Sequence, residues 1–181
     1  MKKTTSRRLF LRKSAVVTTG LVFLSSNVVN AFIDESPYQG YNPYSEEKTD
    51  LRTGLFGKHA RIKGTIYNKT GGTPIVGAII EVWHLSPNST KYRHRAKLKT
   101  NSLGEYNFIT DFPNKEKNKC PRVFFKVSHN NTSVFTEVLF NDRGAYITSK
   151  HWEDQSALGS KLLPKFKKSL GNSTINFNIS I

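Results

Sequence analysis

Histidine and carboxylate side chains are the residues of this 181-residue chain whose types could hold a metal ion. A metal site normally needs three or more convergent donors, and a recognisable motif places them at fixed spacings along the sequence. No pair of the candidates has such a spacing, so the sequence offers metal donors without a metal motif. The candidates are His84, His94, His129, His151, Asp111 and Glu137.

The elements that must position these side chains are predicted to be short β-strands. Hydrophobic and polar residues alternate in several segments, and turn residues separate the segments. Such a series predicts an all-β fold, an antiparallel β-sandwich. The predicted strands are Arg61–Tyr67, Gly77–Leu85, Gly104–Thr110, Val123–Val127, Val134–Phe140 and Ile175–Ile181.

Two segments depart from the alternating pattern. Phe32–Lys58 is rich in tyrosine, proline, glycine and charge, and it is predicted to be an irregular N-terminal arm. Asp154–Leu170 is the one helical candidate, and Pro164 inside it predicts a broken or late-starting helix. We therefore expect at most one short helix.

The first 31 residues have the layout of an export signal. Arg7 and Arg8 precede an apolar doublet, further basic residues and an uncharged segment that ends at Ala31. This layout is typical of the twin-arginine route, which implies the translocase as a partner during export and a periplasmic or extracellular location. The expected organisation is a signal peptide at 1–31, the arm at 32–58 and a β-sandwich at 59–181.

The chain is strongly basic, with 28 Lys and Arg against 13 Asp and Glu. The signal holds six of the basic residues and none of the acidic ones, so the mature chain keeps a formal charge of +9. This charge favours acidic partners such as envelope polymers or anionic lipid, and no motif indicates specific nucleic-acid recognition. Cys120 is the only cysteine, which excludes an intrachain disulfide, and no later apolar run approaches membrane-spanning length.

One long segment resembles a known enzyme family. IKGTIYNKTGGTPIVGAIIEVWHLSPNSTKY (Ile62–Tyr92), followed by GEYNF (Gly104–Phe108), is similar to the signature of the intradiol ring-cleavage dioxygenases. The upstream PYQGYNPYSEEKTDLR resembles the lead-in arm of that family. The resemblance runs from about Glu35 to about Asp142 and implies a β-sandwich of the intradiol dioxygenase or transthyretin-like type. Part of the signature also occurs in carboxypeptidase-regulatory-like sandwiches.

The resemblance implies a ferric ion held by two tyrosinates and by a His-x-His pair on one strand. Tyr92 stands at the first tyrosine position, but residues 110–120, where the second is expected, contain no tyrosine. Arg122 and Phe124 stand at the His-x-His positions and share one face of their strand. Because protonated arginine is not a metal ligand and phenylalanine has no donor atom, three of the four implied ligands are missing. An arginine and a glutamine of the family's site fall near Lys119 and on Glu137.

A rebuilt metal site would need other ligands close to Tyr92. His94 is two residues further on and shares a face with Tyr92 if that stretch is extended. His84 lies at the end of the preceding strand. These two histidines and Glu137 are the replacement ligands to consider.

Basic side chains suggest a second chemistry at the same positions. Arg122 and Lys119 could bind a carboxylate or phosphate through charge-assisted hydrogen bonds, in a pocket that includes Glu137, His94 and His84. The alternative is that Arg122 covers the sheet edge with its stem and reaches water.

Three functions from different classes remain open. The favoured one is an exported relative of the intradiol dioxygenases without a complete ferric site or cofactor, which binds a small aromatic or anionic ligand or an envelope partner. The alternatives are an active dioxygenase with Fe(III) and atypical ligands, and a carboxypeptidase-regulatory-like interaction module. The resemblance also implies a homodimer, because family members commonly pair through the N-terminal region, here residues 32–58.

Overall fold

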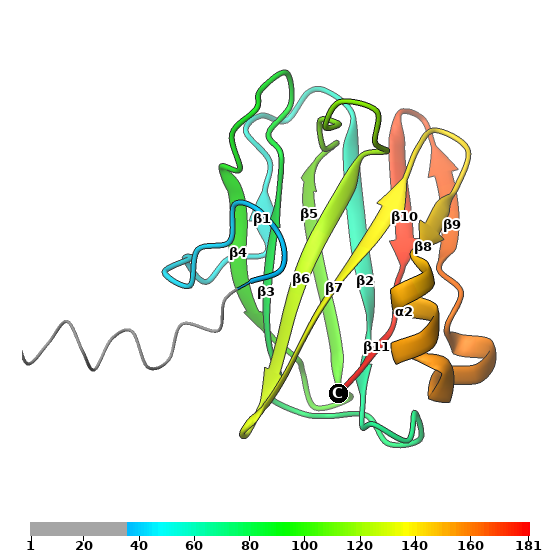
Figure 1. Cartoon of the computed structure of the whole chain (residues 1–181). Coiled ribbons are helices and arrows are strands. Elements are labelled where there is room, and N and C mark those ends of the chain that lie inside the picture. The colour runs from blue at the N-terminus through cyan, green and yellow to red at the C-terminus, as the bar shows by residue number, and fades with distance from the viewer. Residues whose placement is uncertain (1–35) are drawn as a thin grey trace, which may run out of the picture. The chain divides into compact units, whose positions relative to one another are not determined.

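The computed structural model describes residues 36–181, and the predicted export signal lies outside this range. Two β-sheets pack face to face, and a short helical segment lies beside one end of them (Figure 1). No helix within residues 36–181 is long and apolar enough to cross a membrane.

The first sheet has six strands. They are β1 (Asp50–Leu51), β2 (His59–Tyr67), β5 (Glu105–Asp111), β9 (Lys165–Ser169), β10 (Asn172–Asn176) and β11 (Ile179–Ser180). Their spatial order is β1-β5-β2-β10-β9, and β11 also pairs with β2. The β2–β5 and β9–β10 pairs are antiparallel, whereas β1 joins β5 and both β10 and β11 join β2 in parallel.

The second sheet has five strands, and all its neighbouring pairs are antiparallel. They are β3 (Ile79–His84), β4 (His94–Lys99), β6 (Arg122–His129), β7 (Thr132–Phe140) and β8 (Ala145–Ile147). Their spatial order is β4-β3-β6-β7-β8. The sequence HRAKLK of β4 was not among the predicted strands. Only its alternate residues His94, Ala96 and Leu98 are buried, so a basic outer side conceals the pattern.

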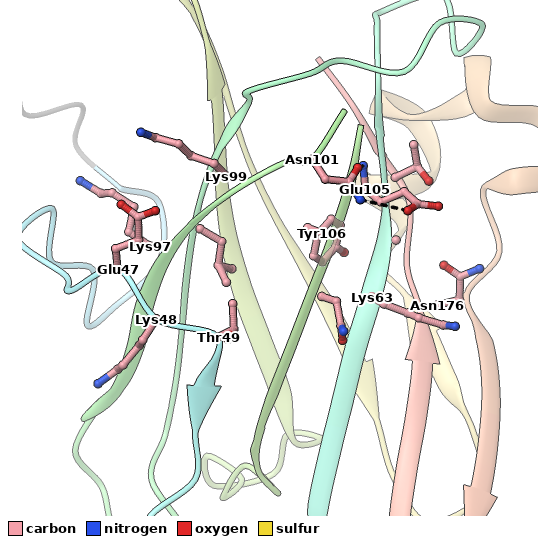
Figure 2. A pocket seen from close by; sticks show the side chains of 14 residues that line it. Glu47, Lys48, Thr49, Lys63, Lys97, Lys99, Asn101, Glu105, Tyr106 and Asn176 are labelled. Atoms are coloured by element: carbon pink, nitrogen blue, oxygen red, sulfur yellow. Dashed lines mark hydrogen bonds between the residues drawn. The ribbon is translucent and has the colours of Figure 1, made fainter. Parts of the chain in front are cut away.

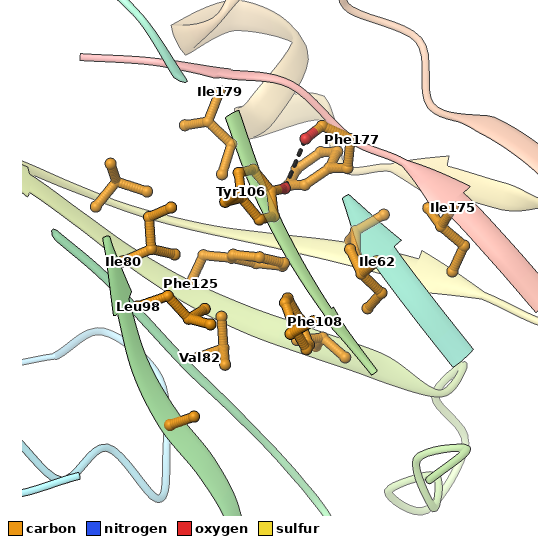
Figure 3. Close-up of a cluster of buried hydrophobic side chains, with 14 of the residues drawn as sticks. Ile62, Ile80, Val82, Leu98, Tyr106, Phe108, Phe125, Ile175, Phe177 and Ile179 are labelled. Atoms are coloured by element: carbon orange, nitrogen blue, oxygen red, sulfur yellow. Dashed lines mark hydrogen bonds between the residues drawn. The ribbon is translucent and has the colours of Figure 1, made fainter. Parts of the chain in front are cut away.

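The core lies between the two sheets and consists of alternate residues of the strands (Figure 3). Ile62, Phe108 and Ile175 come from the first sheet, and Val82 and Phe125 from the second. All five are at most 1% exposed. Burying a side chain of this kind contributes on the order of 1.5–3 kcal/mol. The all-β sandwich predicted from the period-two pattern is confirmed.

The last predicted strand, Ile175–Ile181, is interrupted. Ile175 pairs with Ile62 and Ile179 pairs with Ile66, so the register along β2 is the same on both sides of the break. At the break the side-chain Oδ1 of Asn178 accepts the Thr65 backbone N–H at 2.9 Å. A side chain thus replaces one backbone partner there.

Only part of the predicted helix over Asp154–Leu170 forms, and it is broken before Pro164. The chain forms α2 (Ser149–Asp154) and a 3₁₀ turn, η2 (Ser156–Lys161), and then enters β9 after Pro164. Pro164 lacks a backbone N–H and its ring clashes with the preceding turn, so a helix cannot continue through it. We expected at most one short helix, and the described residues contain two short helical segments, α2 and η2.

Residues 36–58 run along the sheets with turns and one short strand. The Lys97 backbone N–H donates to the Glu46 carbonyl at 2.8 Å, and the Lys48 N–H donates to the Lys97 carbonyl at 3.2 Å. These bonds join the arm to β4, and β1 joins it to β5.

Candidate functional site

Arg122 and Phe124, which stand at the implied His-x-His positions, lie on the outer face of the second sheet. Trp83 of β3 pairs with Phe124 of β6, which pairs with Glu137 of β7, so the three side chains stand in one row. All three are at most 6% exposed, and the arm packs on Trp83 and Phe124. We call this surface the arm-covered face.

Arg122 and Glu137 form an ion pair at the end of this row. Arg122 Nη1 donates to Glu137 Oε2 at 2.8 Å. The Arg122 side chain is 17% exposed and that of Glu137 is 8% exposed, so both charges are largely removed from water. A carboxylate buried to this degree needs a cationic partner, and Arg122 supplies it.

Tyr92 lies in the loop before β4 and contacts Phe124 and Glu116. Its hydroxyl donates to Glu116 Oε1 at 2.9 Å, and its ring centroid lies 6.2 Å from that of Phe124. Burial, together with the hydrogen bond to Glu116, raises the pKa of Tyr92 to about 12. Glu116 also accepts from Lys119, and this bond holds the pKa of Glu116 below its usual value. Tyr92 is therefore a neutral phenol at physiological pH.

The arm places two further residues against the site. The Tyr38 ring lies 4.8 Å from the Phe124 ring, and the backbone carbonyl of Gln39 accepts the Trp83 indole N–H at 2.9 Å. Gly40 follows with φ +79°, and a Cβ there would lie 2.2 Å from Cγ of Tyr92. Only glycine allows the chain to pass this close to the tyrosine ring. Burial, followed by the charge of Glu137, raises the pKa of Tyr38 to about 12.

The donor set does not fit the four-ligand ferric centre that the resemblance implies. Arg122 donates to Glu137 and has no lone pair to offer while protonated. Phe124 is packed between Tyr38 and Trp83, at centroid distances of 4.8 and 5.6 Å. Within residues 36–181, no cluster of three or more His, Cys, Asp or Glu side chains has a metal-binding arrangement.

The structure does not bring the replacement ligands together with Tyr92. His84 alternates with Trp83 along β3 and so lies on the opposite face from Glu137. His84 Nδ1 donates to the Leu85 carbonyl at 2.8 Å, and Nε2 of the neutral ring accepts from the Thr110 hydroxyl at 2.6 Å. Its complete burial lowers its pKa to about 3. Its role in the described structure is to join β3 to β5.

His94 stacks on His84 with ring centroids 4.8 Å apart. Its Nδ1 lies 2.8 Å from Ser86 Oγ, and its Nε2 lies 2.9 Å from Asp111 Oδ2. Both ring nitrogens thus have partners away from Tyr92.

Asp111 is the centre of a buried polar cluster that the sequence did not indicate. Thr53 of the arm donates to Asp111 Oδ2 through its backbone N–H at 2.9 Å and its hydroxyl at 2.6 Å. His59 Nε2 lies 3.3 Å from Asp111 Oδ1 but without hydrogen-bond geometry. Burial acts to raise the pKa of Asp111, but the hydrogen bonds from Thr53 and His94 outweigh it, so the pKa lies below its usual value.

The two remaining histidine candidates lie apart from each other. His129 ends β6 and is half-buried. His151 is buried in α2, with its Nδ1 2.6 Å from Thr136 Oγ1 and its ring 4.8 Å from that of Phe177. Burial lowers the pKa of His151 to about 4. His151 therefore holds α2 against the sandwich as a neutral ring.

Sequence reasoning missed Tyr38, Gly40, Glu116 and His59 as neighbours of the predicted site residues. For Tyr38 and Gly40 a signal existed, since both belong to the PYQG stretch that resembles the family's lead-in arm. Glu116 lies in a lysine-rich loop without a pattern, and His59 opens β2 next to Ala60, which is also buried, so the alternation of β2 begins only after His59.

Solved structures of dioxygenases share this architecture. The dioxygenase domain of a dioxygenase carbohydrate-binding protein fusion from Streptomyces sp. SirexAA-E matches with a TM-score of 0.60 at 17% identity, over 81% of this chain and 94% of that one. An intradiol ring-cleavage dioxygenase from Tetranychus urticae matches at 0.59 and 15% identity, over 81% and 91% of the two chains. The chain has the fold of the intradiol ring-cleavage dioxygenases.

Other members of this fold group give the same result. A chlorocatechol 1,2-dioxygenase from Pseudomonas putida matches with a TM-score of 0.59 at 21% identity, over 81% of this chain and 69% of that one. No family model and no curated protein sequence matches the chain. The resemblance predicted from the Ile62–Tyr92 signature is thus confirmed in the fold, at low sequence identity.

Proposed function

We propose that this chain is an exported binding protein built on the intradiol dioxygenase fold, in which an arginine replaces the ferric ion as the central cation. The observation that carries the proposal is the Arg122–Glu137 ion pair on the arm-covered face. A guanidinium there supplies a permanent positive charge that needs no metal loading.

The surroundings of Arg122 support this interpretation. Its charge acts to lower the pKa of Tyr38, Tyr92 and Glu116, so two phenols and two carboxylates, those of Glu116 and Glu137, lie near one cation. In the family that the fold resembles, anionic oxygens surround Fe(III). Here the phenols stay protonated and the carboxylates compensate the arginine.

The net charge of the chain indicates which class of partner it would bind. The formal charge of +9 after removal of residues 1–31 suits an acidic partner. The similar structures are described as dioxygenases, but a shared fold does not carry an activity without its site residues. We infer that the partner is an acidic component of the cell envelope, which the predicted twin-arginine export would allow the chain to reach.

Oxygen uptake tests the absence of ring cleavage. Protein exported natively and supplemented with Fe(II) and Fe(III) would be incubated with catechol, 4-chlorocatechol, protocatechuate and hydroxyquinol on an oxygen electrode. We expect uptake no faster than with iron alone. Oxygen consumption in one-to-one proportion with a ring-opened diacid would overturn the proposal and favour the active dioxygenase.

We also infer that residues 32–58 contribute to a homodimer. Tyr44 and Leu55 are each 76% exposed and Phe56 is 97% exposed, which is unusual for large apolar side chains in so short a segment. Sedimentation of the wild type and of the variant Leu55→Ser with Phe56→Ser tests this. A mass equal to one chain for the wild type would contradict it.

A further inference from the structure

A basic cleft lies apart from Tyr92, Arg122 and Glu137, none of which lines it. It has a volume of about 740 Å³ and opens between the arm and strands β4, β5 and β2 (Figure 2). We call it the lysine cleft. Its polar lining includes Lys48, Lys63, Lys97, Lys99, Asn107 and Asn176.

The four lysines give the cleft an excess of positive charge, since only two glutamates line it. Lys48 and Lys97 have carboxylate neighbours at 3.4 and 3.8 Å, whereas Lys63 and Lys99 form no ion pair with any residue of the range 36–181. The two unpaired cations lie on different strands, β2 and β4. They are exposed and available to a ligand.

The basic surface continues from the cleft across the outer face of the first sheet. Lys165 pairs with Asn176, which pairs with Lys63, which in turn pairs with Asn107. Neighbouring strands are about 4.8 Å apart, so the two lysine backbones of this row are about 10 Å apart with an amide between them.

A second row runs parallel to the first on the same face. Lys167 pairs with Thr174, which pairs with Arg61. Arg61 also donates to Asn107 Oδ1 at 3.2 Å. The face thus alternates cations with amide and hydroxyl groups over three adjacent strands.

This alternation fits a polymer that carries both negative charges and hydroxyl groups. Lysine ammonium groups bind carboxylates or phosphates, and amide and hydroxyl side chains hydrogen-bond to sugar hydroxyls. The only aromatic residue in the lining is Tyr106, which is 3% exposed and donates its hydroxyl to the Phe177 carbonyl at 2.6 Å. The cleft therefore has no platform on which a nucleobase could stack.

We propose that the lysine cleft and the two rows beside it bind an acidic glycan. The inference rests on the proposed function in its choice of an envelope polymer as the partner. It does not depend on the state of the Tyr92 site, because Tyr92, Arg122 and Glu137 do not line the cleft.

Fluorescence anisotropy with labelled oligogalacturonate tests the proposal. The mature wild type would be compared with the variant Lys63→Gln, Lys99→Gln and with the control Lys115→Gln, Lys117→Gln. The control removes the same charge from two exposed lysines in the loop between β5 and β6. We expect the dissociation constant to rise roughly tenfold or more in the cleft variant and less than about twofold in the control. Binding by the wild type should also weaken as the salt concentration rises.

Three results would overturn the proposal. They are no saturable binding by the wild type, an equal loss in both variants, and equal affinity for oligothymidylate of similar length. Fully methyl-esterified oligogalacturonate, which has the same sugar without the charge, should fail to compete. Iron bound at Tyr92 would refute the proposed function but leave this comparison unchanged, so the two failures are distinguishable.

Discussion

Arg122 Nη1 and Glu137 Oε2 lie 2.8 Å apart on a face of the sandwich where only 17% and 8% of their side chains are exposed. The pair occupies the positions where the resemblance implies a histidine ligand and a glutamine of the dioxygenase site. Its consequence is that this face has a fixed cation and its counter-ion in place of metal donors.

Removal of Arg122 should destabilise the protein more than removal of the whole pair. In Arg122→Met the Glu137 carboxylate remains buried without its partner, which costs on the order of 2–4 kcal/mol of unfolding free energy. The double variant Arg122→Met, Glu137→Gln should recover much of this loss. Urea unfolding of the wild type, both single variants and the double variant measures the coupling, and additive effects would contradict a direct pair.

The close approach of Gly40 to Tyr92 predicts a specific effect of a methyl group. Gly40→Ala places Cβ against the tyrosine ring and should lift the arm, whereas Gly77 has a similar φ of +72° with no atom within 4 Å of the added Cβ. Gly77→Ala should cost only about 1 kcal/mol, from backbone strain. Gly40→Ala should cost more and shift the Trp83 emission to the red, because the arm shields this indole. Equal effects of the two substitutions would refute the contact.

Acid should destabilise the fold partly through His151. Its pKa in the folded chain is about 4, below the ordinary value near 6.5, so between these pH values the unfolded chain binds more protons than the folded one. Stability from this group is complete above about pH 6.5 and is lost as the pH falls toward 4, by up to about 3 kcal/mol.

The variant His151→Phe keeps a ring beside Phe177 but cannot take up a proton. Its unfolding free energy should fall less between pH 7 and pH 4.5 than that of the wild type. His84 contributes with the same sign and over a wider range, since its pKa is about 3, and it remains in both proteins. An unchanged pH dependence in His151→Phe would show that the pKa of His151 is the same in the folded and the unfolded chain.

Export should depend on the arginine pair. Arg7→Lys with Arg8→Lys should leave the precursor inside the cell, whereas Arg12→Lys, a change of the same kind outside the pair, should not. Cell fractionation and intact mass measure both, and the mature chain should begin at Phe32, after Ala31. Normal export of the paired variant would favour a different secretion route.

The strands of the core could be predicted from the sequence because each turns one apolar side inward. Ile62 and Phe108 alternate with more exposed residues, because one face of each strand contacts solvent. Such alternation can be recognised in the sequence alone. The strand β4 escaped prediction because its buried positions include His94, a polar residue that Ser86 and Asp111 satisfy.

The site could be predicted only in part. Strand alternation predicts that Arg122 and Phe124 lie on the same face of the sheet. The side chains that pair with Arg122 and with Tyr92 come from other segments. Glu137 lies on the neighbouring strand β7, and Glu116 lies in a loop. The negative charges that balance the charge of Arg122 therefore reach it through tertiary contacts. Sequence spacing carries no information about such contacts, and Glu137 was placed in the site only by the family resemblance.

The central claim is that Arg122 replaces iron, and iron binding tests it most directly. Mature protein, exported natively and purified without chelator, would be analysed for metal content and visible absorbance before and after addition of Fe(III), beside Tyr92→Phe. We predict far less than one iron per chain and no tyrosinate charge-transfer band in either protein. Near-stoichiometric iron with a visible band that Tyr92→Phe abolishes would contradict the account.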